Sequence, residues 1–371
     1  MTDVQDPPSR NLALDGLRGL ALVLVVLSHG WALWPGGGSG SNAPWWQVLR
    51  SGNLAVTVFL VAGGYLLIAG LMRLPSNGSS ADYVRAVLRR VIRIAVPVLV
   101  LVVAILAVSV LDPTDDTPPS TTRKSAWAIS TFTWNWYVQN SALAARADLG
   151  HLWYVSVFVQ GVLLLTALFF MQRHRLWLFA ATIGALLCLV IWWRAHLMTT
   201  EPNMVLTLLR TSTRIDGMLW GALLASTAPW WRRLQVPWHA VAITGLVVLL
   251  ALTLTVGGSS SYFGWQGQAM AIGTVLATAG LAATDSALAS RVLSIQSLAW
   301  LGQNSLTIYV WHYPVFFFVA RHTGDWAWPA RTAVGLALAG GLSYLLIRLV
   351  ERPIGGWLRR SRWTRPGSST A

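Results

Sequence analysis

Long apolar runs constrain this chain more than any other feature of its sequence. Of its 371 residues, 55% are hydrophobic and 11% are charged, whereas an ordinary soluble chain is about 25% charged. A helix needs about 20 apolar residues to cross a bilayer. Ten runs come near that length, at residues 12–34, 54–73, 93–111, 152–171, 176–194, 203–225, 238–256, 267–284, 296–320 and 330–350. The sequence therefore predicts an all-α, polytopic integral membrane protein with about ten transmembrane helices.

The arginines alternate between the two sets of loops. One set includes the segment between the second and third runs and the C-terminal tail, and it holds most of the arginines; the opposite set holds few. Because basic loops stay in the cytoplasm, we expect both termini there. Residues 1–9 would be a cytoplasmic tail, 10–358 a single ten-helix membrane domain, and 359–371 a basic cytoplasmic tail.

The formal net charge of +14 would be typical of nucleic-acid binding in a soluble protein. Here the cytoplasmic loops account for most of it, so we expect the lipid bilayer as a partner and no nucleic acid. No spacing of His, Cys or Glu residues predicts a metal site.

The first run carries three groups that are costly in lipid: Asp15, Arg18 and His29. Ionisable side chains inside a spanning helix usually mark a pathway or an active site. Arg18 and His29 are eleven positions apart, which is close to three turns, so they lie on one face about 16 Å apart. The alternative is an ordinary spanning helix, in which the arginine side chain extends to the membrane interface and the histidine is buried with its hydrogen bonds made.

Other polar groups are expected at the depth of His29, in the outer half of the membrane. They come from the fourth, sixth and ninth runs: His151, Arg210, Arg214, Asp216 and His312. Arg210 and Arg214 would share a helix face at their spacing of four, whereas Arg214 and Asp216 would not face each other. His312 precedes a helix-kinking Pro314, and a packed interfacial histidine remains the alternative for it.

The first run also resembles the opening of the acyltransferase 3 family, membrane-bound O-acyltransferases that modify extracytoplasmic glycans. The resemblance rests on Arg10, on Leu14–Gly19 (LDGLRG) and on Ser28-His29. Further segments are similar in order along the chain: Asn53–Leu67, Tyr83–Pro97, His151–Val157, Thr213–Gly221, Leu301–Pro314 and Glu351-Arg352-Pro353. The resemblance implies a bacterial cytoplasmic (inner) membrane protein that crosses the membrane many times.

The chain departs from the family at one position and in one domain. Many members carry a Glu followed by a Gln where this sequence has Phe158, Val159 and Gln160. If that Glu orients the histidine or the acceptor, Asp148 or Asp216 is expected to replace it. The resemblance does not include the C-terminal SGNH-type hydrolase domain of fused members, so direct delivery or a separate partner protein is expected.

The resemblance implies a function for the two polar levels. A cytoplasmic acyl-CoA, in the first instance acetyl-CoA, would be the donor substrate, with no bound cofactor. Its phosphates would lie on a basic surface of Arg85, Arg89, Arg90 and Arg93, a cluster that alternatively serves only to set the topology. His29 would be the catalytic base or a transient acyl carrier, Arg18 the cation that positions the donor or couples the helices, and Asp15 a further residue of the catalytic site. The acceptor would be a hydroxyl of a glycan or glycolipid, and the acceptor side would be lined by Arg210, Arg214, Asp216, His312 and His151. The alternative is a transporter or flippase of a lipid-linked sugar.

Overall fold

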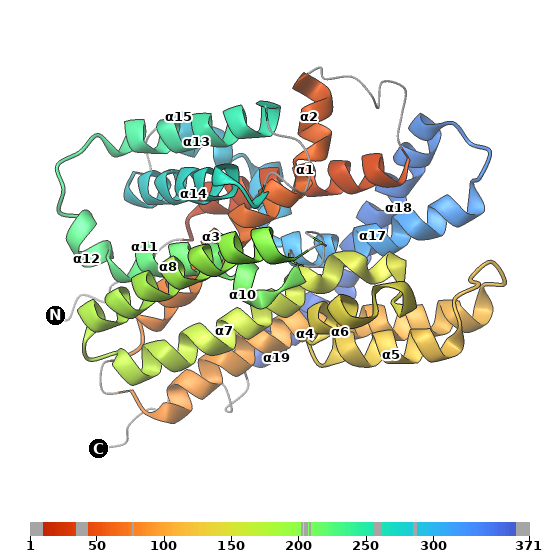
Figure 1. Cartoon of the computed structure of the whole chain (residues 1–371), viewed down its shortest axis with the longest axis horizontal. Coiled ribbons are helices and arrows are strands. Elements are labelled where there is room, and N and C mark those ends of the chain that lie inside the picture. The colour runs from red at the N-terminus through yellow and green to blue at the C-terminus, as the bar shows by residue number, and fades with distance from the viewer. Residues whose placement is uncertain are drawn as a thin grey trace.

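The computed structural model describes residues 10–34, 44–75, 78–201, 203, 207, 209–255, 262–284 and 288–360. These residues form helices and their connections, without a strand, and the long helices run roughly side by side along the longest axis of the molecule (Figure 1). The expected tail at 1–9 and residues 361–371 of the second tail lie outside this described part. The all-α prediction is confirmed.

Within the described residues, seven segments are long and apolar enough to cross a membrane. They are α1 (Leu12–Leu33), α3 (Gly52–Leu71), α4 (Ser80–Leu111), η2 (Ala147–Leu152) with α7 (Trp153–Gln172), α8 (Leu176–Thr200), α13 (Trp238–Thr255), and α18 (Trp328–Leu346) continuing through η4 (Ile347–Glu351) into α19 (Arg352–Arg360). The protein is therefore a polytopic membrane protein, and the count of ten stays a prediction.

The other three predicted spans are helical but interrupted or less apolar. Residues 267–284 lie in α14 (Trp265–Ala283). Residues 296–320 are divided at Asn304 into α16 (Gln296–Gln303) and α17 (Ser305–His322). In the described part of 203–225, the short α10 (Thr211–Arg214) precedes α11 (Asp216–Ser226).

Shorter helices fill the connections. They are α2 (Pro44–Arg50), α5 (Pro119–Ser130), α6 (Trp134–Ser141), η1 (Ala142–Ala144), α12 (Ala228–Trp231) and α15 (Leu288–Leu293). Helices α5 and α6 form most of the long connection between α4 and α7, and they lie beside α4 and α7 at one end of the molecule (Figure 1). The aromatic part of this connection, residues 127–137, lies at the end of α5 and the start of α6.

Glycines let the helices around the site approach at backbone distance. A Cβ on Gly221 of α11 would lie 2.0 Å from the carbonyl oxygen of Val61 in α3, and one on Gly302 would lie 1.7 Å from that of Asp15 in α1. Small residues at such close contacts, called seams below, are typical of helix association in membranes. Lipid tails are as apolar as the helix surfaces, so the hydrophobic effect does not drive the helices together and close packing must do so. The α1–α16 and α3–α11 contacts thus fix the helices that carry the polar groups.

We expect Gly221→Ala, at the α3–α11 seam, to destabilise the protein. The added methyl group would meet backbone atoms of Val61 and Tyr65, which cannot rotate away, and overpacking of this kind costs about 1–3 kcal/mol. Thermal unfolding in detergent should show a lower midpoint. Gly341→Ala in α18 is the matched control, because nothing lies within 4 Å of its Cβ position; an equal loss in both variants would contradict this account of the seam.

Candidate active site

Three histidines from three helical segments lie together. Nδ1 of His29 in α1 is 2.8 Å from Nε2 of His312 in α17. The ring of His151, from η2, is centred 6.3 Å from the ring of His29 and 5.4 Å from that of His312. Tyr313 lies against this cluster, with ring centres 4.6 Å from His29 and 5.0 Å from His151. The structure therefore brings together all three histidines that the sequence placed in the outer half of the membrane.

Pro314 explains how His151 is held. A proline has no backbone N–H, so in a helix it leaves the carbonyl four residues earlier without its usual donor. Here that carbonyl belongs to Val310, and Nε2 of His151 donates to it over 3.1 Å. The Tyr309 hydroxyl donates to the backbone carbonyl of His151 over 2.7 Å. Nδ1 of His151 is buried and has no hydrogen-bond partner within the described chain.

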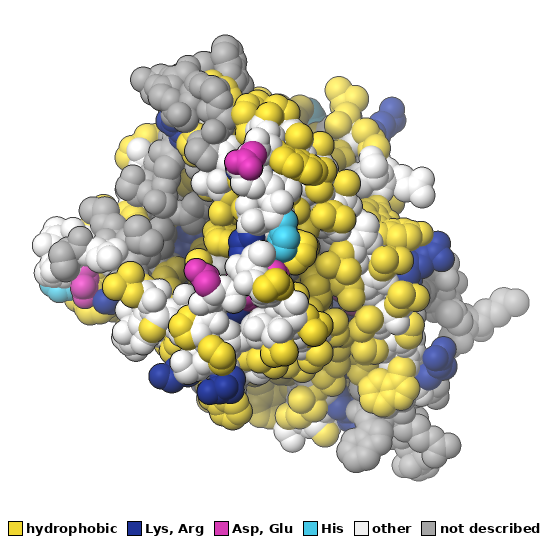
Figure 2. All heavy atoms as spheres, turned by 90° about the vertical axis from the view of Figure 1, so that its right-hand side faces the viewer, with side chains coloured by type: hydrophobic (Ala, Val, Ile, Leu, Met, Phe, Trp, Pro, Cys, Tyr) yellow, Lys and Arg dark blue, Asp and Glu magenta, His cyan; other side chains and the backbone are white. Residues whose placement is uncertain are grey.

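Access to the cluster differs between its members. His151 and His312 are buried, whereas His29 is partly exposed. The molecular face at the end where α5 and α6 lie carries acidic, basic and histidine side chains near its middle, among uncharged polar atoms and with hydrophobic side chains around them (Figure 2). His29 is thus the member of the cluster that a bound substrate can reach with the least rearrangement.

A cavity of about 550 Å³ approaches the cluster from the other direction. Four arginines line it, Arg18, Arg89, Arg90 and Arg93, and none of the described residues in its lining is acidic. Its walls include apolar side chains of α3, α4 and α7, and it reaches Ser305 and Tyr309 of α17. Tyr309 also contacts the cluster, since its ring is centred 5.2 Å from that of His151. One tyrosine therefore borders both the cationic cavity and the histidines.

Asp15 and Ser305 hold Arg18 at this cavity. Nη1 of Arg18 is 3.3 Å from Oδ1 of Asp15, and Nη2 donates to Oγ of Ser305 over 2.9 Å. Asp15 also accepts two hydrogen bonds from Arg10 and is itself buried. Its carboxylate therefore balances two cations and fixes the guanidinium of Arg18, rather than facing the histidines.

The basic surface predicted on α4 is divided. Arg89, Arg90 and Arg93 line the cavity, and Arg90 donates to the carbonyl of Gly63 over 3.3 Å. Arg85 lies outside the cavity lining and instead donates to Asp82 over 2.7 Å in the first turn of α4. Three of the four arginines predicted to bind the donor therefore share one cavity.

The polar groups of the sixth run have partners that the sequence did not indicate. Arg210 precedes α10 with extended backbone angles and pairs with Glu201 at 2.9 Å, so it does not share a helix face with Arg214. The guanidinium of Arg214 lies over the ring of Tyr262, 3.6 Å from its centre. Neither arginine contacts a histidine ring through any described hydrogen bond.

Asp216 has three donors in the described chain. Arg194 of α8 donates to its carboxylate over 2.8 Å, Gln268 of α14 donates over 2.8 Å, and the Tyr262 hydroxyl donates as well. Arg194 is buried, and its position at the end of an apolar run carries no local signal of an ion pair with Asp216. The carboxylate is fully engaged and does not replace the family Glu as an orienting group for a histidine.

The family described as an acyltransferase domain matches residues 11–348 of the chain. The chain belongs to the acyltransferase 3 family. This match includes α1, α17 and every residue of the histidine cluster, so the family resemblance of the first run extends to the whole site.

Two relatives illustrate the match. The chain is 24% identical over 360 residues to O-acetyltransferase OatA of Staphylococcus aureus, covering 92% of this chain and 56% of that protein. It is 27% identical over 369 residues to peptidoglycan O-acetyltransferase OatA of Listeria monocytogenes, covering 92% and 55%. The chain thus spans about half the length of the curated relatives it matches. No solved structure matches it significantly.

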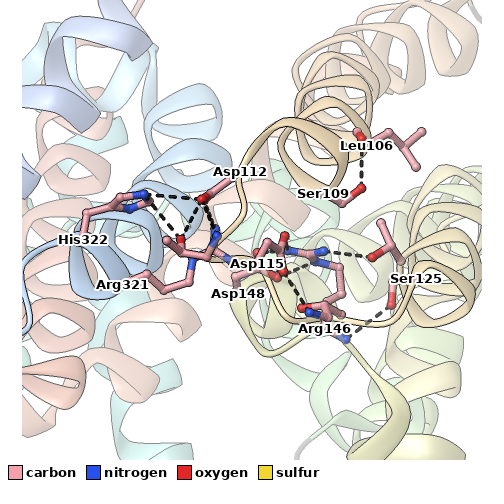
Figure 3. A network of polar contacts seen from close by, with 12 residues as sticks. Leu106, Ser109, Asp112, Asp115, Ser125, Arg146, Asp148, Arg321 and His322 are labelled. Atoms are coloured by element: carbon pink, nitrogen blue, oxygen red, sulfur yellow. Dashed lines mark hydrogen bonds and ion pairs between the residues drawn. The ribbon is translucent and has the colours of Figure 1, made fainter.

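This acyltransferase domain also has an ionic network at the C-terminal end of α17 (Figure 3). Arg146 is buried and pairs with Asp115 at 2.8 Å and with Asp148 at 2.7 Å. Arg321, near the end of α17, is 3.2 Å from Asp115 and 3.4 Å from Asp112. Asp148, the second expected replacement for the family Glu, is therefore engaged here. The network ties the helix that carries His312 to the connection between α4 and α7.

The network predicts an acid-sensitive contribution to stability. Burial raises the pKa of the Asp115 carboxyl, but hydrogen bonds from Thr117 and Arg146 and the charge of Arg146 outweigh burial and lower the pKa to about 2. In the unfolded chain an Asp pKa is about 3.9. A lowered folded-state pKa stabilises the protein above the unfolded value, and this stability is lost as the pH falls from about 4 to about 2.

Arg146→Met should remove this stabilisation and leave two buried carboxylates without their main partner, which costs about 3–5 kcal/mol. Unfolding midpoints measured between pH 3 and pH 8 should be lower at neutral pH and depend less on acid than those of the wild type. Arg123→Met, on the exposed face of α5, is the control. An unchanged neutral-pH midpoint in Arg146→Met would refute the anchoring role of the network.

Proposed function

We propose that this chain is a membrane-bound O-acyltransferase that moves an acyl group, in the first instance acetyl, from a cytoplasmic acyl-CoA to a hydroxyl of an extracytoplasmic glycan or glycolipid. The observation that carries the proposal is the position of Tyr309, which borders both a cationic cavity and a cluster of three histidines. Such an arrangement suits a reaction whose two substrates arrive from opposite sides. The name of the Listeria relative, peptidoglycan O-acetyltransferase, supports a glycan acceptor.

The cavity suits the donor. An acyl-CoA carries several phosphates and a long, mostly uncharged arm that ends in the thioester. Arg89, Arg90 and Arg93 would hold the phosphates, since guanidinium groups bind phosphate through paired hydrogen bonds. The arm would lie along the apolar wall past Arg18 and Ser305, and its thioester end would extend past Tyr309 toward His29.

The histidines suit the transfer. His29 would take the proton of the acceptor hydroxyl while the hydroxyl oxygen attacks the thioester carbonyl. The carbon–sulfur bond then breaks, the ester forms, and the CoA thiolate leaves and recovers a proton. In the two-step variant, His29 attacks the carbonyl first and carries the acyl group until the acceptor arrives. The bare Nδ1 of His151 offers a buried acceptor for a hydrogen bond from the incoming hydroxyl.

Purified full-length protein, radiolabelled acetyl-CoA and an envelope glycan extract test the activity. The wild type should release CoA and label the glycan, and His29→Ala should lose at least about 100-fold of that rate, as expected for a general base. Arg18→Lys should lose most activity as well. A lysine ammonium lacks the planar guanidinium whose separate N–H groups bind Asp15 and Ser305 together. Absence of CoA release with every acyl donor would refute the proposal and favour a transporter.

The donor cavity makes a separate prediction. Arg90→Ala should raise the KM for acyl-CoA about tenfold, which corresponds to the loss of about 1.4 kcal/mol, with kcat changed less than about twofold. Arg175→Ala is the matched control, because Arg175 is exposed at the start of α8 and lies outside the cavity lining. Equal effects of the two variants on KM would contradict the assignment of this cavity to the donor.

A further inference from the structure

The hydrogen bonds of His312 fix which of its nitrogens carries a proton. Its Nδ1 lies 2.8 Å from the backbone oxygen of Tyr309 and 3.2 Å from that of Ile308. A carbonyl oxygen can only accept a hydrogen bond. Nδ1 of His312 must therefore be the N–H nitrogen, because a lone pair there would face two carbonyl oxygens at contact distance.

The other nitrogen of His312 then determines the state of His29. His312 is 0% exposed, and no acidic side chain among the described residues forms a hydrogen bond with it. A charged imidazolium in that position would be unpaired and costly, so the ring is neutral and its Nε2 is an acceptor. Nδ1 of His29, at 2.8 Å, must donate to it. A neutral His29 with its proton on Nδ1 has a bare Nε2.

We propose that His312 is a positioning residue that holds His29 in the tautomer with a free Nε2, and that this nitrogen is the reactive atom. The inference deepens the proposed acyl transfer, and its catalytic consequence rests on that proposal. The tautomer itself follows from the hydrogen bonds alone.

Asp148 and Asp216, the two carboxylates expected to orient a histidine, are engaged with arginines instead, and Phe158 lines the cationic cavity. A carboxylate next to a catalytic histidine fixes its tautomer by accepting from one ring nitrogen. His312 does the same as a neutral acceptor, and the resting cluster then carries no charge, which lowers the cost of keeping it inside the membrane.

The proton has a defined place during the reaction. When Nε2 of His29 takes the hydroxyl proton, the ring becomes an imidazolium that still donates from Nδ1 to His312. The hydrogen bond strengthens because the donor is now charged. The same proton on Nε2 is available to the CoA thiolate, directly or through water, so the cluster returns to its neutral state after each transfer.

Nitrogen NMR of the full chain in lipid, with ¹⁵N-labelled histidine, tests the tautomer without reference to activity. Chemical shifts distinguish an N–H nitrogen from a bare one, and the His29 signals are assigned by their loss in His29→Ala. We expect a protonated Nδ1 and a bare Nε2 for His29 in the wild type at pH 7. A proton on Nε2 of His29 would overturn the inference.

Two variants at position 312 test the consequence. His312→Leu removes the acceptor and should shift His29 toward the tautomer with Nε2–H; kcat should fall about 100-fold with the KM for acyl-CoA changed less than about twofold. His312→Gln places an amide oxygen near the position of Nε2 and should keep the tautomer and keep kcat within about tenfold of the wild type. Equal losses in both variants would contradict a positioning role.

The two proposals fail separately. A wild type that transfers no acyl group refutes the proposed function, whereas the nitrogen signals of that same protein still decide the tautomer. Active wild type with a protonated Nε2 refutes only the inference. If His312→Leu does not fold, the wild-type spectrum and the His312→Gln kinetics remain decisive.

Discussion

Two side-chain hydrogen bonds between α1 and α17 define the site. His29 bonds to His312 at one level, and Arg18 bonds to Ser305 at the other, over 2.8 and 2.9 Å. Water is absent from the hydrocarbon region, so each polar group there must find its partner within the protein. Each of these two helices supplies hydrogen-bond partners for polar side chains of the other. The paired bonds thereby fix the depth of the histidine cluster relative to the cationic cavity. In the proposed reaction this pair of helices sets how far the arm of the donor must extend from the cavity to His29.

Charge balance separates the structural ionic groups from the groups proposed to bind substrate. Arg194 is matched by Asp216 in the core, and Arg146 is matched by two aspartates at the C-terminal end of α17. Burying such ions is tolerable when they are paired and hydrogen-bonded. None of the described residues that line the cavity is acidic, and Arg18 there is paired with Asp15 outside the lining. In the proposed function the phosphates of the donor bring negative charge into this cavity.

Helical periodicity explains what the sequence could predict. The spacing of Arg18 and His29 placed both on one face of α1, and both bond to α17. The length of the apolar runs located the helical segments, but it did not indicate the break before α11. At that break Thr213 donates to the backbone oxygens of Thr207 and Arg210. Such bonds from a side chain to the backbone compete with a continuous helix. Partners on distant helices, such as Arg194 for Asp216, carry no local signal. Arg85 was grouped with the cavity arginines because spacing alone cannot show that Asp82 binds it.

In the proposed function, donor and acceptor reach one transfer site from opposite membrane faces. Sealed proteoliposomes with the protein in one known orientation test it most directly. Acetyl-CoA is supplied only on the side where α3 connects to α4, and a glycan acceptor only on the other side. The account predicts labelled glycan in this arrangement and none when the two compartments are exchanged. Equal labelling with both substrates on a single side, in vesicles shown to be sealed, would contradict it.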